Sequence, residues 1–352
     1  MKMNLFESQS LPAKIVDPGA AAETHRYKQT RLWVRARESG LGEWVRSSRR
    51  CRRELWAWVK CSQVAMPTVE QLTESIAALG TVGAETVNES RENEAPIFLL
   101  STGWRAGSTL LQRVLVTDPR LLLWGEPLGE MTLVSRIAEM VSHFISPRNL
   151  GLWKDQEDPS SPTLATSWVA NLYPSSGDFR SALRSLFDQW LAEPARQRGY
   201  ARWGFKEVRF GATEACLLHW LYPNAKFVLI SRHPYDCYRS LADSGWEEVY
   251  YRYPDMTVDS AAAFAKCWNQ IAVSWNQLPA EFPCFHIKYD DLIGGGIDFR
   301  NLECWLGLEI KESVALKASV GGTAKRSRLS WYERWIIAHE AESGMRCLGY
   351  LQ

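Results

Sequence analysis

The sequence predicts an α/β fold in which a central parallel sheet is flanked by helices and preceded by a helical N-terminal extension. From residue 95 onward, short apolar runs rich in β-branched and aromatic residues alternate with segments of helical periodicity. Before residue 95 the chain is basic and rich in Trp, and it shows no such alternation. We therefore divide the chain into an N-terminal extension with a linker, residues 1–94, and a main domain, residues 95–352.

The N-terminal extension is defined by its charge. Residues 26–60 contain eleven Lys or Arg against three Glu, interleaved with four Trp. This spacing predicts basic amphipathic helices, which either dock on an anionic partner or pack on the main domain through their Trp side. A short helix is predicted near Val69–Leu79. The polar, acidic stretch Gly80–Glu94 is predicted to be a linker.

The main domain contains five candidate strands, each short, apolar and followed by turn residues. They are Pro96–Ser101, Leu121–Trp124, Trp203–Glu207, Lys226–Ser231 and Cys284–Tyr289. Between the second and third strands, residues 146–199 are rich in Pro, Ser and Trp, with helical patches near Thr163–Leu172 and Phe179–Leu191. An insertion of this kind predicts a lid or an acceptor-binding element.

Composition excludes several classes of function. The formal net charge is +1, so no nucleic-acid partner is expected. No apolar run reaches the length of a membrane span, and the first residues lack the pattern of a secretory signal. The eight Cys are scattered without metal-ligand spacing, as is typical of reduced thiols. We expect a cytoplasmic protein without a metal; its oligomeric state is not readable from the sequence.

The first candidate binding motif follows the first strand. Residues 101–109, STGWRAGST, join that strand to an apolar-periodic helix. A strand, a glycine-containing turn and a helix N-terminus direct main-chain N–H groups at one point, which makes an anion site. Gly103 and Gly107 allow a close approach that a side chain would block. The motif therefore predicts a P-loop-containing nucleotide-binding fold.

This loop departs from the pattern GxxxxGK[ST] of loops that cleave ATP or GTP. When Gly107 is aligned with the second glycine, Thr102 takes the place of the first glycine and Ser108 that of the lysine. A kinase or NTPase needs that lysine at the β- and γ-phosphates. Here a different cation, Arg105, lies inside the loop. The exchange suits a ligand with one phosphate fewer to neutralise.

A second motif follows the strand Lys226–Ser231. Arg232 stands at the carboxyl end of this strand, Pro234 opens the next helix, and Ser240 comes eight residues after Arg232. A guanidinium at a strand end and a hydroxyl two turns along the next helix can converge on one phosphate. The two motifs together therefore predict two separate phosphate contacts.

The two motifs resemble the signatures by which the sulfotransferase family binds 3′-phosphoadenylyl sulfate (PAPS). WRAGST resembles the loop for the 5′-phosphosulfate, and the strand–Arg–x–Pro–x5–Ser pattern resembles the 3′-phosphate site. Residues 285–292, FHIKYDDL, followed by LGL at 306–308, resemble the family's strand–YEDL–helix–LGL segment. The terminal Leu348-Gly349-Tyr350 is common in bacterial members. The likeness covers Ala95–Gln352 and indicates a soluble, bacterial-type member.

The resemblance implies PAPS as the donor and assigns residues to it. Arg232 and Ser240 would bind the 3′-phosphate. The stretch 321–328, GGTAKRSR, matches the family's basic C-terminal loop, with Lys325 and Arg326 as candidate phosphate contacts. It departs from the GxxGxWK pattern of cytosolic animal-type enzymes, so the contacting cation stays open, and a surface turn is the alternative. The 5′-phosphosulfate would be bound by Trp104, Arg105, Ala106, Gly107, Ser108 and Thr109.

The resemblance also implies in-line, metal-independent transfer of a sulfuryl group to a hydroxyl or amine, with release of 3′,5′-phosphoadenosine (PAP). Arg105 and Lys206 would neutralise the charge that develops during transfer. Animal-type enzymes place a basic histidine two residues after such a lysine, where this chain has Val208. Glu126 follows the second strand, where protein-tyrosine sulfotransferases place a glutamate, and is the first candidate for the general base. Glu207 is the second candidate; a helix-capping role for Glu126 is the alternative. An apolar neighbour such as Trp124 would raise the pKa of Glu126 toward that of a useful general base.

The sequence says less about the acceptor. A small metabolite or natural product is the expected acceptor. Two rival functions remain: a P-loop kinase or NTPase, and a non-catalytic nucleotide-binding protein whose residues 26–60 engage a partner. Aromatic residues that could line an acceptor pocket, or simply fill the core, are Trp153, Trp168, Tyr173, Trp246, Tyr250 and Tyr251.

Overall fold

The computed structural model describes residues 68–81, 95–126, 132–143, 160, 162, 176–244, 251–253, 256–311, 313 and 328–351. All of these belong to one compact unit, Cys61–Gln352. Several predictions fall outside the described residues: the basic segment 26–60, most of the linker, the loop cations Lys325 and Arg326, and the aromatic residues Trp153, Trp168, Tyr173, Trp246 and Tyr250.

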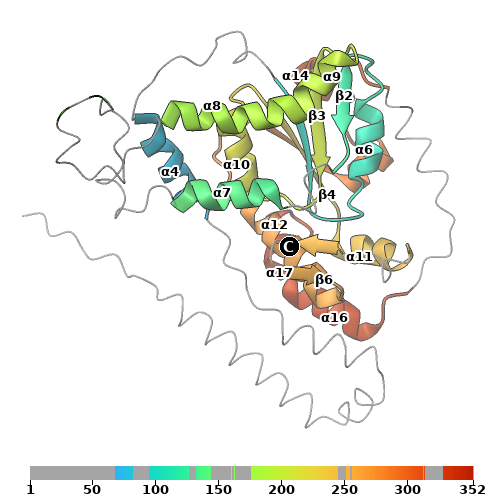
Figure 1. Ribbon diagram of the computed structural model, residues 1–352. Helices are drawn as coiled ribbons and strands as arrows, with labels where there is room; N and C mark the ends of the chain where they lie inside the picture. Colours follow the sequence, from blue (N-terminus) through green and yellow to red (C-terminus); the bar gives the residue numbers. More distant parts are fainter. Residues whose placement is uncertain are drawn as a thin grey trace, which may run out of the picture. The chain divides into compact units, whose positions relative to one another are not determined.

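The centre of the unit is a sheet of five parallel strands in the order β2-β3-β1-β4-β7 (Figure 1). All five predicted strands are confirmed. Because every strand runs the same way, their carboxyl ends meet at one edge of the sheet, where ligands bind in open α/β folds. The strands are β1 (Ile97–Ser101), β2 (Leu121–Trp124), β3 (Arg202–Glu207), β4 (Lys226–Ser231) and β7 (Cys284–Lys288).

Helices cover both faces of this sheet (Figure 1). Successive side chains of β1 point to opposite faces, so Ile97 and Leu99 join one buried cluster while Phe98 and Leu100 join another. The run is apolar throughout because both of its faces are buried. The Leu99 face is covered by α6 (Ser108–Leu115), α13 (Tyr289–Gly294) and α14 (Phe299–Leu306). The Phe98 face is covered by α7 (Leu133–His143), α10 (Ala212–Leu221) and α12 (Ala261–Trp275).

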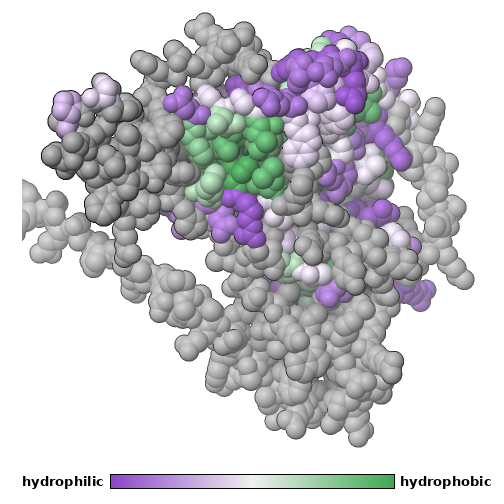
Figure 2. All heavy atoms as spheres, viewed as in Figure 1, coloured by the Kyte–Doolittle hydropathy of each residue, from purple (hydrophilic) through white to green (hydrophobic). Residues whose placement is uncertain are grey.

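The described end of the predicted insertion 146–199 is helical and packed. It consists of α8 (Ser176–Phe187), a π-helical turn η3 (Asp188–Ala192) and α9 (Glu193–Gln197), which lead into β3. Tyr222, just after α10, donates from its hydroxyl to Asp188 at 2.7 Å, and Phe187 is fully buried. Figure 2 shows an apolar area between α7 and α8 on the viewed face. This helical part forms a wall of the core, and the lid role stays a prediction.

A helix inside the predicted N-terminal extension packs on the main domain. The expected short helix is observed as α4 (Val69–Thr81), and Thr68 caps it by accepting from the main-chain N of Gln71 at 3.1 Å. Leu72 is buried among α7 and α10, and the Ser75 hydroxyl donates to the carbonyl of Ser142 at 3.1 Å. In the described part of the chain, no helix is long and apolar enough to span a membrane.

The C-terminal helices close over α12 and lead to a well-anchored tyrosine. They are α16 (Trp331–Glu340) and α17 (Glu342–Cys347), and a further helix, α11 (Pro234–Ala242), contacts α16. The Tyr350 hydroxyl lies 3.1 Å from the hydroxyl of Ser231, the last residue of β4. Its ring packs edge-on against His233. The two residues that flank Arg232 are therefore both held by Tyr350.

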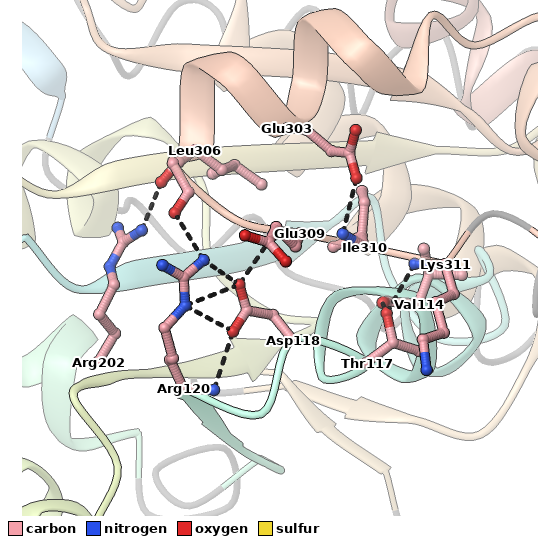
Figure 3. Close-up of polar contacts among 11 residues, drawn as sticks. Val114, Thr117, Asp118, Arg120, Arg202, Glu303, Leu306, Glu309, Ile310 and Lys311 are labelled. Carbon is pink, nitrogen blue, oxygen red and sulfur yellow. Dashed lines mark hydrogen bonds and ion pairs between the residues drawn. The ribbon is translucent and has the colours of Figure 1, made fainter.

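At the amino ends of the strands, away from the carboxyl edge, a buried carboxylate joins distant parts of the chain (Figure 3). Asp118 accepts from the main-chain N of Arg120 and of Glu309, both at 2.8 Å, and from the Arg120 guanidinium. Nearby, Lys311 N donates to the Thr117 hydroxyl at 2.8 Å. The side-chain hydrogen bond from Arg120 is the main cause that holds the pKa of Asp118 well below its ordinary value. This cluster fixes the start of β2 to the segment after α14.

Arg202 reinforces the same edge at the start of β3. Its guanidinium donates to the carbonyl oxygen of Leu306, the last residue of α14, and to that of Ala95 at 3.0 Å (Figure 3 shows the first contact). The strand thus begins with a half-buried arginine that binds main-chain carbonyls. The other end of the same strand carries the candidate catalytic residues.

Candidate functional site at the carboxyl edge of the sheet

The loop between β1 and α6 has a backbone suited to binding an anion. Gly103 and Gly107 have φ of +118° and +99°, and Arg105 between them has φ of +65°. Left-handed residues at every second position turn successive N–H groups toward a common centre. A non-glycine residue with positive φ is uncommon, and such residues gather at functional sites. The predicted phosphate loop is therefore present as a strand–loop–helix unit.

Gly107 is required by a close approach as well as by its backbone angle. A Cβ built on this residue would lie 2.3 Å from Cδ2 of Tyr289, the first residue of α13. Gly107 also caps α6, and its carbonyl accepts from Leu111 N at 3.0 Å. Any side chain here would push the loop away from the Tyr289 ring. The glycine therefore sets the distance between the loop and the strand end at β7.

The side chains of the predicted loop residues point in two directions. Trp104 is 4% exposed and Ala106 is fully buried, so both anchor the loop in the core. Any contact of these two with a ligand would come from the main chain. Ser108 is buried at the start of α6, while Arg105 and Thr109 are exposed. Among the loop side chains, Arg105 and Thr109 are therefore the most open to solvent.

Arg232 and Ser240, predicted to bind a second phosphate, meet this loop directly. Arg232 donates from Nη1 to the carbonyl oxygen of Arg105 at 3.1 Å. Arg105 in turn donates from Nε to the Ser240 hydroxyl at 3.1 Å. The two sequence motifs are thus joined by two hydrogen bonds, one through the main chain of the loop and one through its side chain.

The position of Arg232 is fixed from several sides. Its carbonyl accepts from the indole N of Trp268 at 3.2 Å, and its guanidinium lies 4.1 Å from the centre of the Tyr289 ring. A cation over an aromatic face is held by the ring quadrupole. Its Nε is buried, and no described atom accepts a hydrogen bond from it. A buried donor without an acceptor calls for one from outside the protein, and a phosphate oxygen would supply it.

A basic cleft of about 570 Å³ adjoins the residue after Arg232. Its lining includes three arginines and a single carboxylate, Asp236, which pairs with Arg239. Burial lowers the pKa of His233 in this lining, so its imidazole is neutral near pH 7. The net charge of the cleft is therefore positive. The lining residues are His233, Tyr235, Asp236, Arg239, Arg328, Leu329 and Arg334.

The candidate catalytic residues meet where β2 and β3 end. The two strands pair in parallel, and Lys206 N donates to the carbonyl oxygen of Gly125 at 3.1 Å. This register places Lys206 Nζ 2.5 Å from Oε1 of Glu126. The Lys206 side chain is 8% exposed and that of Glu126 is 29% exposed. A carboxylate and an ammonium group therefore face each other next to β1, the strand that leads into the phosphate loop.

The second candidate base, Glu207, is in a different environment. It is fully buried, and burial is the main cause that raises its pKa. Its Oε1 accepts from Val208 N and from Arg209, both at 2.8 Å, while Oε2 has no partner among the described residues. A substrate hydroxyl has no open path to such a group, so Glu126 is the more accessible of the two carboxylates.

Arg209 was not among the residues that the sequence singled out, yet it connects this cluster. It donates from Nη1 to Glu126 Oε2 at 3.1 Å and to Glu207, and its guanidinium lies 5.1 Å from the centre of the Trp104 ring. A sequence signal for Arg209 does exist: in an extended chain, residues two apart point to the same face, and Arg209 comes two residues after Glu207. The expected neighbour of Glu126, Trp124, instead donates from its indole N to the carbonyl of Leu191 at 3.0 Å.

Comparisons with known proteins identify the family to which this geometry belongs. A model of the sulfotransferase family matches residues 96–312. A sulfotransferase structure from Alicyclobacillus acidocaldarius is 15% identical, covers 72% of this chain and 94% of that chain, and has a TM-score of 0.40. A sulfotransferase domain from the curacin biosynthetic pathway is 18% identical, with coverage of 71% and 98% and a TM-score of 0.37. A mouse sulfotransferase complexed with PAP is 12% identical, with coverage of 80% and 94% and a TM-score of 0.36. No curated protein matches the chain significantly.

Proposed function

Because the chain belongs to the sulfotransferase family, we propose that it transfers a sulfuryl group from PAPS to a hydroxyl or amine of a small-molecule acceptor. The observation that supports this most is the meeting of Arg105, Arg232 and Ser240 at the carboxyl edge of the sheet. PAPS carries two phosphate groups at opposite sides of its ribose. A site for it needs two anion-binding elements side by side.

The donor would be held by both motifs. The main-chain N–H groups of residues 103–109, with Arg105 and Thr109, would bind the 5′-phosphosulfate. Arg232 and Ser240 would bind the 3′-phosphate, and the buried Nε of Arg232 supports this because it lacks an acceptor. The basic cleft beside His233 adds positive charge at this end. Lys325 and Arg326, which lie outside the described residues, stay candidate contacts of the 3′-phosphate.

The transfer itself needs alignment and charge neutralisation more than covalent help. The acceptor oxygen or amine nitrogen forms a bond to sulfur while the bond from sulfur to the 5′-phosphate oxygen breaks, and PAP leaves with that electron pair. Glu126 would take the acceptor's proton, so the products are a sulfate ester or sulfamate, PAP and a proton. Arg105 and Lys206 would neutralise the charge on the departing phosphate and the sulfuryl oxygens.

The proposal includes the acceptor class and the location. We place the enzyme in the cytoplasm, which agrees with the scattered cysteines, and propose a small metabolite or natural product as the acceptor, with no metal. Among the described residues, no group of three His, Cys, Asp or Glu is arranged to hold a metal ion.

Two rival functions make different predictions. A kinase or NTPase would need a cation in place of Ser108 and a metal-binding carboxylate at the end of β4, where Arg232 stands. A non-catalytic nucleotide-binding protein would bind PAP without transferring sulfate. The cluster of Glu126, Lys206 and Arg209 at the strand ends favours an enzyme.

The test first compares how much different nucleotides stabilise the protein and then measures sulfuryl transfer to a panel of acceptors. The full-length chain is heated with PAP, AMP or ATP with Mg²⁺, and we expect PAP to raise the Tm most. It is then incubated with radiolabelled PAPS and a panel of p-cresol, p-nitrophenol, an aliphatic alcohol and an aryl amine. Label on any acceptor supports the proposal. Stabilisation by ATP with Mg²⁺ but not by PAP would favour the kinase, and PAP binding without transfer would favour the binding protein.

A further inference from the structure

We propose that Arg209 is a positioning residue for the transfer: it holds the Glu126 carboxylate and ties it to the phosphate loop through Trp104. This inference rests on the proposed function, because it gives Glu126 the role of base. The sequence resemblance carries no role for Arg209, and the assignment comes from its contacts alone.

Arg209 is in contact with three separate parts of the site. Its Nη1 lies 3.1 Å from Glu126, which follows β2, and 2.8 Å from Glu207, the last residue of β3. Its guanidinium also lies 5.1 Å from the ring of Trp104 in the phosphate loop. The Arg209 side chain is 6% exposed. One buried, planar group therefore connects the base, the strand end and the donor loop.

The two oxygens of Glu126 are held by different cations. Lys206 binds Oε1 at 2.5 Å, and Arg209 binds Oε2 at 3.1 Å. A carboxylate bound on both oxygens is fixed in rotation as well as in position, which a single contact does not achieve. Rigid placement of the base is worth a large factor in rate because a small displacement misaligns proton transfer. Lys206 alone would leave the carboxyl group free to turn.

Glu207 explains how a guanidinium is kept charged in this buried place. Burial opposes the charge on Arg209, but the carboxylates of Glu207 and Glu126 outweigh it, and the pKa of Arg209 is raised. Glu207 is itself fully buried, so its contact with Arg209 is shielded from water. We therefore assign Glu207 to the support of Arg209 rather than to proton transfer. Arg209 acts through Glu126 and is not itself a catalytic residue.

The test uses two phenols that differ in their need for a base. p-Cresol holds its proton at neutral pH and needs Glu126, whereas p-nitrophenol is largely ionised in mild alkali and does not. We expect R209Q to lower turnover of p-cresol about 30-fold and that of p-nitrophenol less than about 3-fold. PAP affinity should stay within about 2-fold, because Arg209 meets the phosphate loop at the buried ring of Trp104, which anchors the loop in the core. R209K, which keeps the charge, should recover part of the loss.

The control is Arg202, a half-buried arginine at the start of β3, the strand that leads to Arg209; its partners are main-chain carbonyls. R202Q should lower the Tm and leave the ratio of the two phenol rates unchanged. A second control is the pair of variants E126Q and E126Q/R209Q. If Arg209 acts through Glu126, the double variant loses no more than E126Q alone.

Three results would overturn the role of Arg209. They are equal losses with both phenols, full additivity in the double variant, or a crystal structure of R209Q with PAP in which Glu126 keeps its position. That structure also decides the question when neither phenol is an acceptor. The proposed function fails by a separate result, the absence of PAP binding in the wild-type protein, and this inference would then fall with it.

Discussion

The guanidinium of Arg232 donates a hydrogen bond to the carbonyl oxygen of Arg105, 3.1 Å away and 127 residues earlier in the chain. The contact is to the main chain of a residue with positive φ, so it supports the unusual backbone of the loop. A single arginine therefore supports the loop of the first proposed anion site while it belongs to the second. Loss of this side chain should affect both ends of a bound PAP molecule.

Replacing Arg232 by alanine should weaken PAP binding by about 2–4 kcal/mol, since a phosphate loses a charge-assisted contact. Isothermal titration calorimetry measures this directly. R346A is the control, because Arg346 is an exposed arginine paired with Glu342 on α17. Unchanged affinity in R232A would remove Arg232 from the donor site.

Replacing Glu126 by glutamine should lower turnover about 100-fold or more, because the acceptor loses its general base. The affinity for PAP should change little. The measurement is the initial rate with saturating PAPS and a weakly acidic acceptor such as p-cresol. E207Q provides the comparison: if E126Q keeps its turnover and E207Q does not, the base is Glu207.

The loop geometry predicts a difference between two glycines with positive φ. G199A meets open space, so it carries only the cost of left-handed backbone, about 1–2 kcal/mol. G107A meets the ring of Tyr289 as well and should be destabilised further, with loss of PAP binding. Urea unfolding and calorimetry on the two variants separate these effects. Equal stability and equal PAP affinity would mean that the Tyr289 contact does not shape the loop.

Asp118 predicts an acid-dependent loss of stability. Its folded pKa lies below its ordinary value of 3.8, so its contribution is fully present above that value and is lost as the pH falls further. D118N should therefore lower the Tm at pH 7 by several degrees, and the gap to wild type should narrow below pH 4. The control is D298N at the exposed N-cap of α14, where asparagine caps equally well. A gap that stays constant with pH would contradict the assignment.

Much of this arrangement could be predicted from the sequence, because it depends on local pattern. Each strand is a short apolar run bounded by turn residues, and β1, buried on both faces, is apolar throughout. The meeting of Arg105 and Arg232 follows from one rule, that the carboxyl ends of parallel strands share an edge. Once the strands are assigned, both residues are expected at the carboxyl edge of the sheet.

Other features depend on contacts that no local pattern specifies. Glu126 and Lys206 are paired because β2 and β3 are neighbours in register, and strand order is not written in either segment. Trp104 is buried in the apolar core, and the Arg209 guanidinium lies near its ring, although Arg209 follows a different strand. For the same reason, α4 lies in the stretch predicted as an extension yet packs on α7 and α10. Long-range packing decides all three.

The central place of β1 has a consequence for how the protein is made. Its hydrogen-bonding neighbours on both sides, β3 and β4, come more than a hundred residues later, while the next strand in sequence, β2, is not its neighbour. An apolar strand emerging from the ribosome must therefore wait, unpaired, for a long stretch of chain to be synthesised. Slow translation at low temperature, or a co-expressed chaperone that shields such strands, should raise the yield of native enzyme.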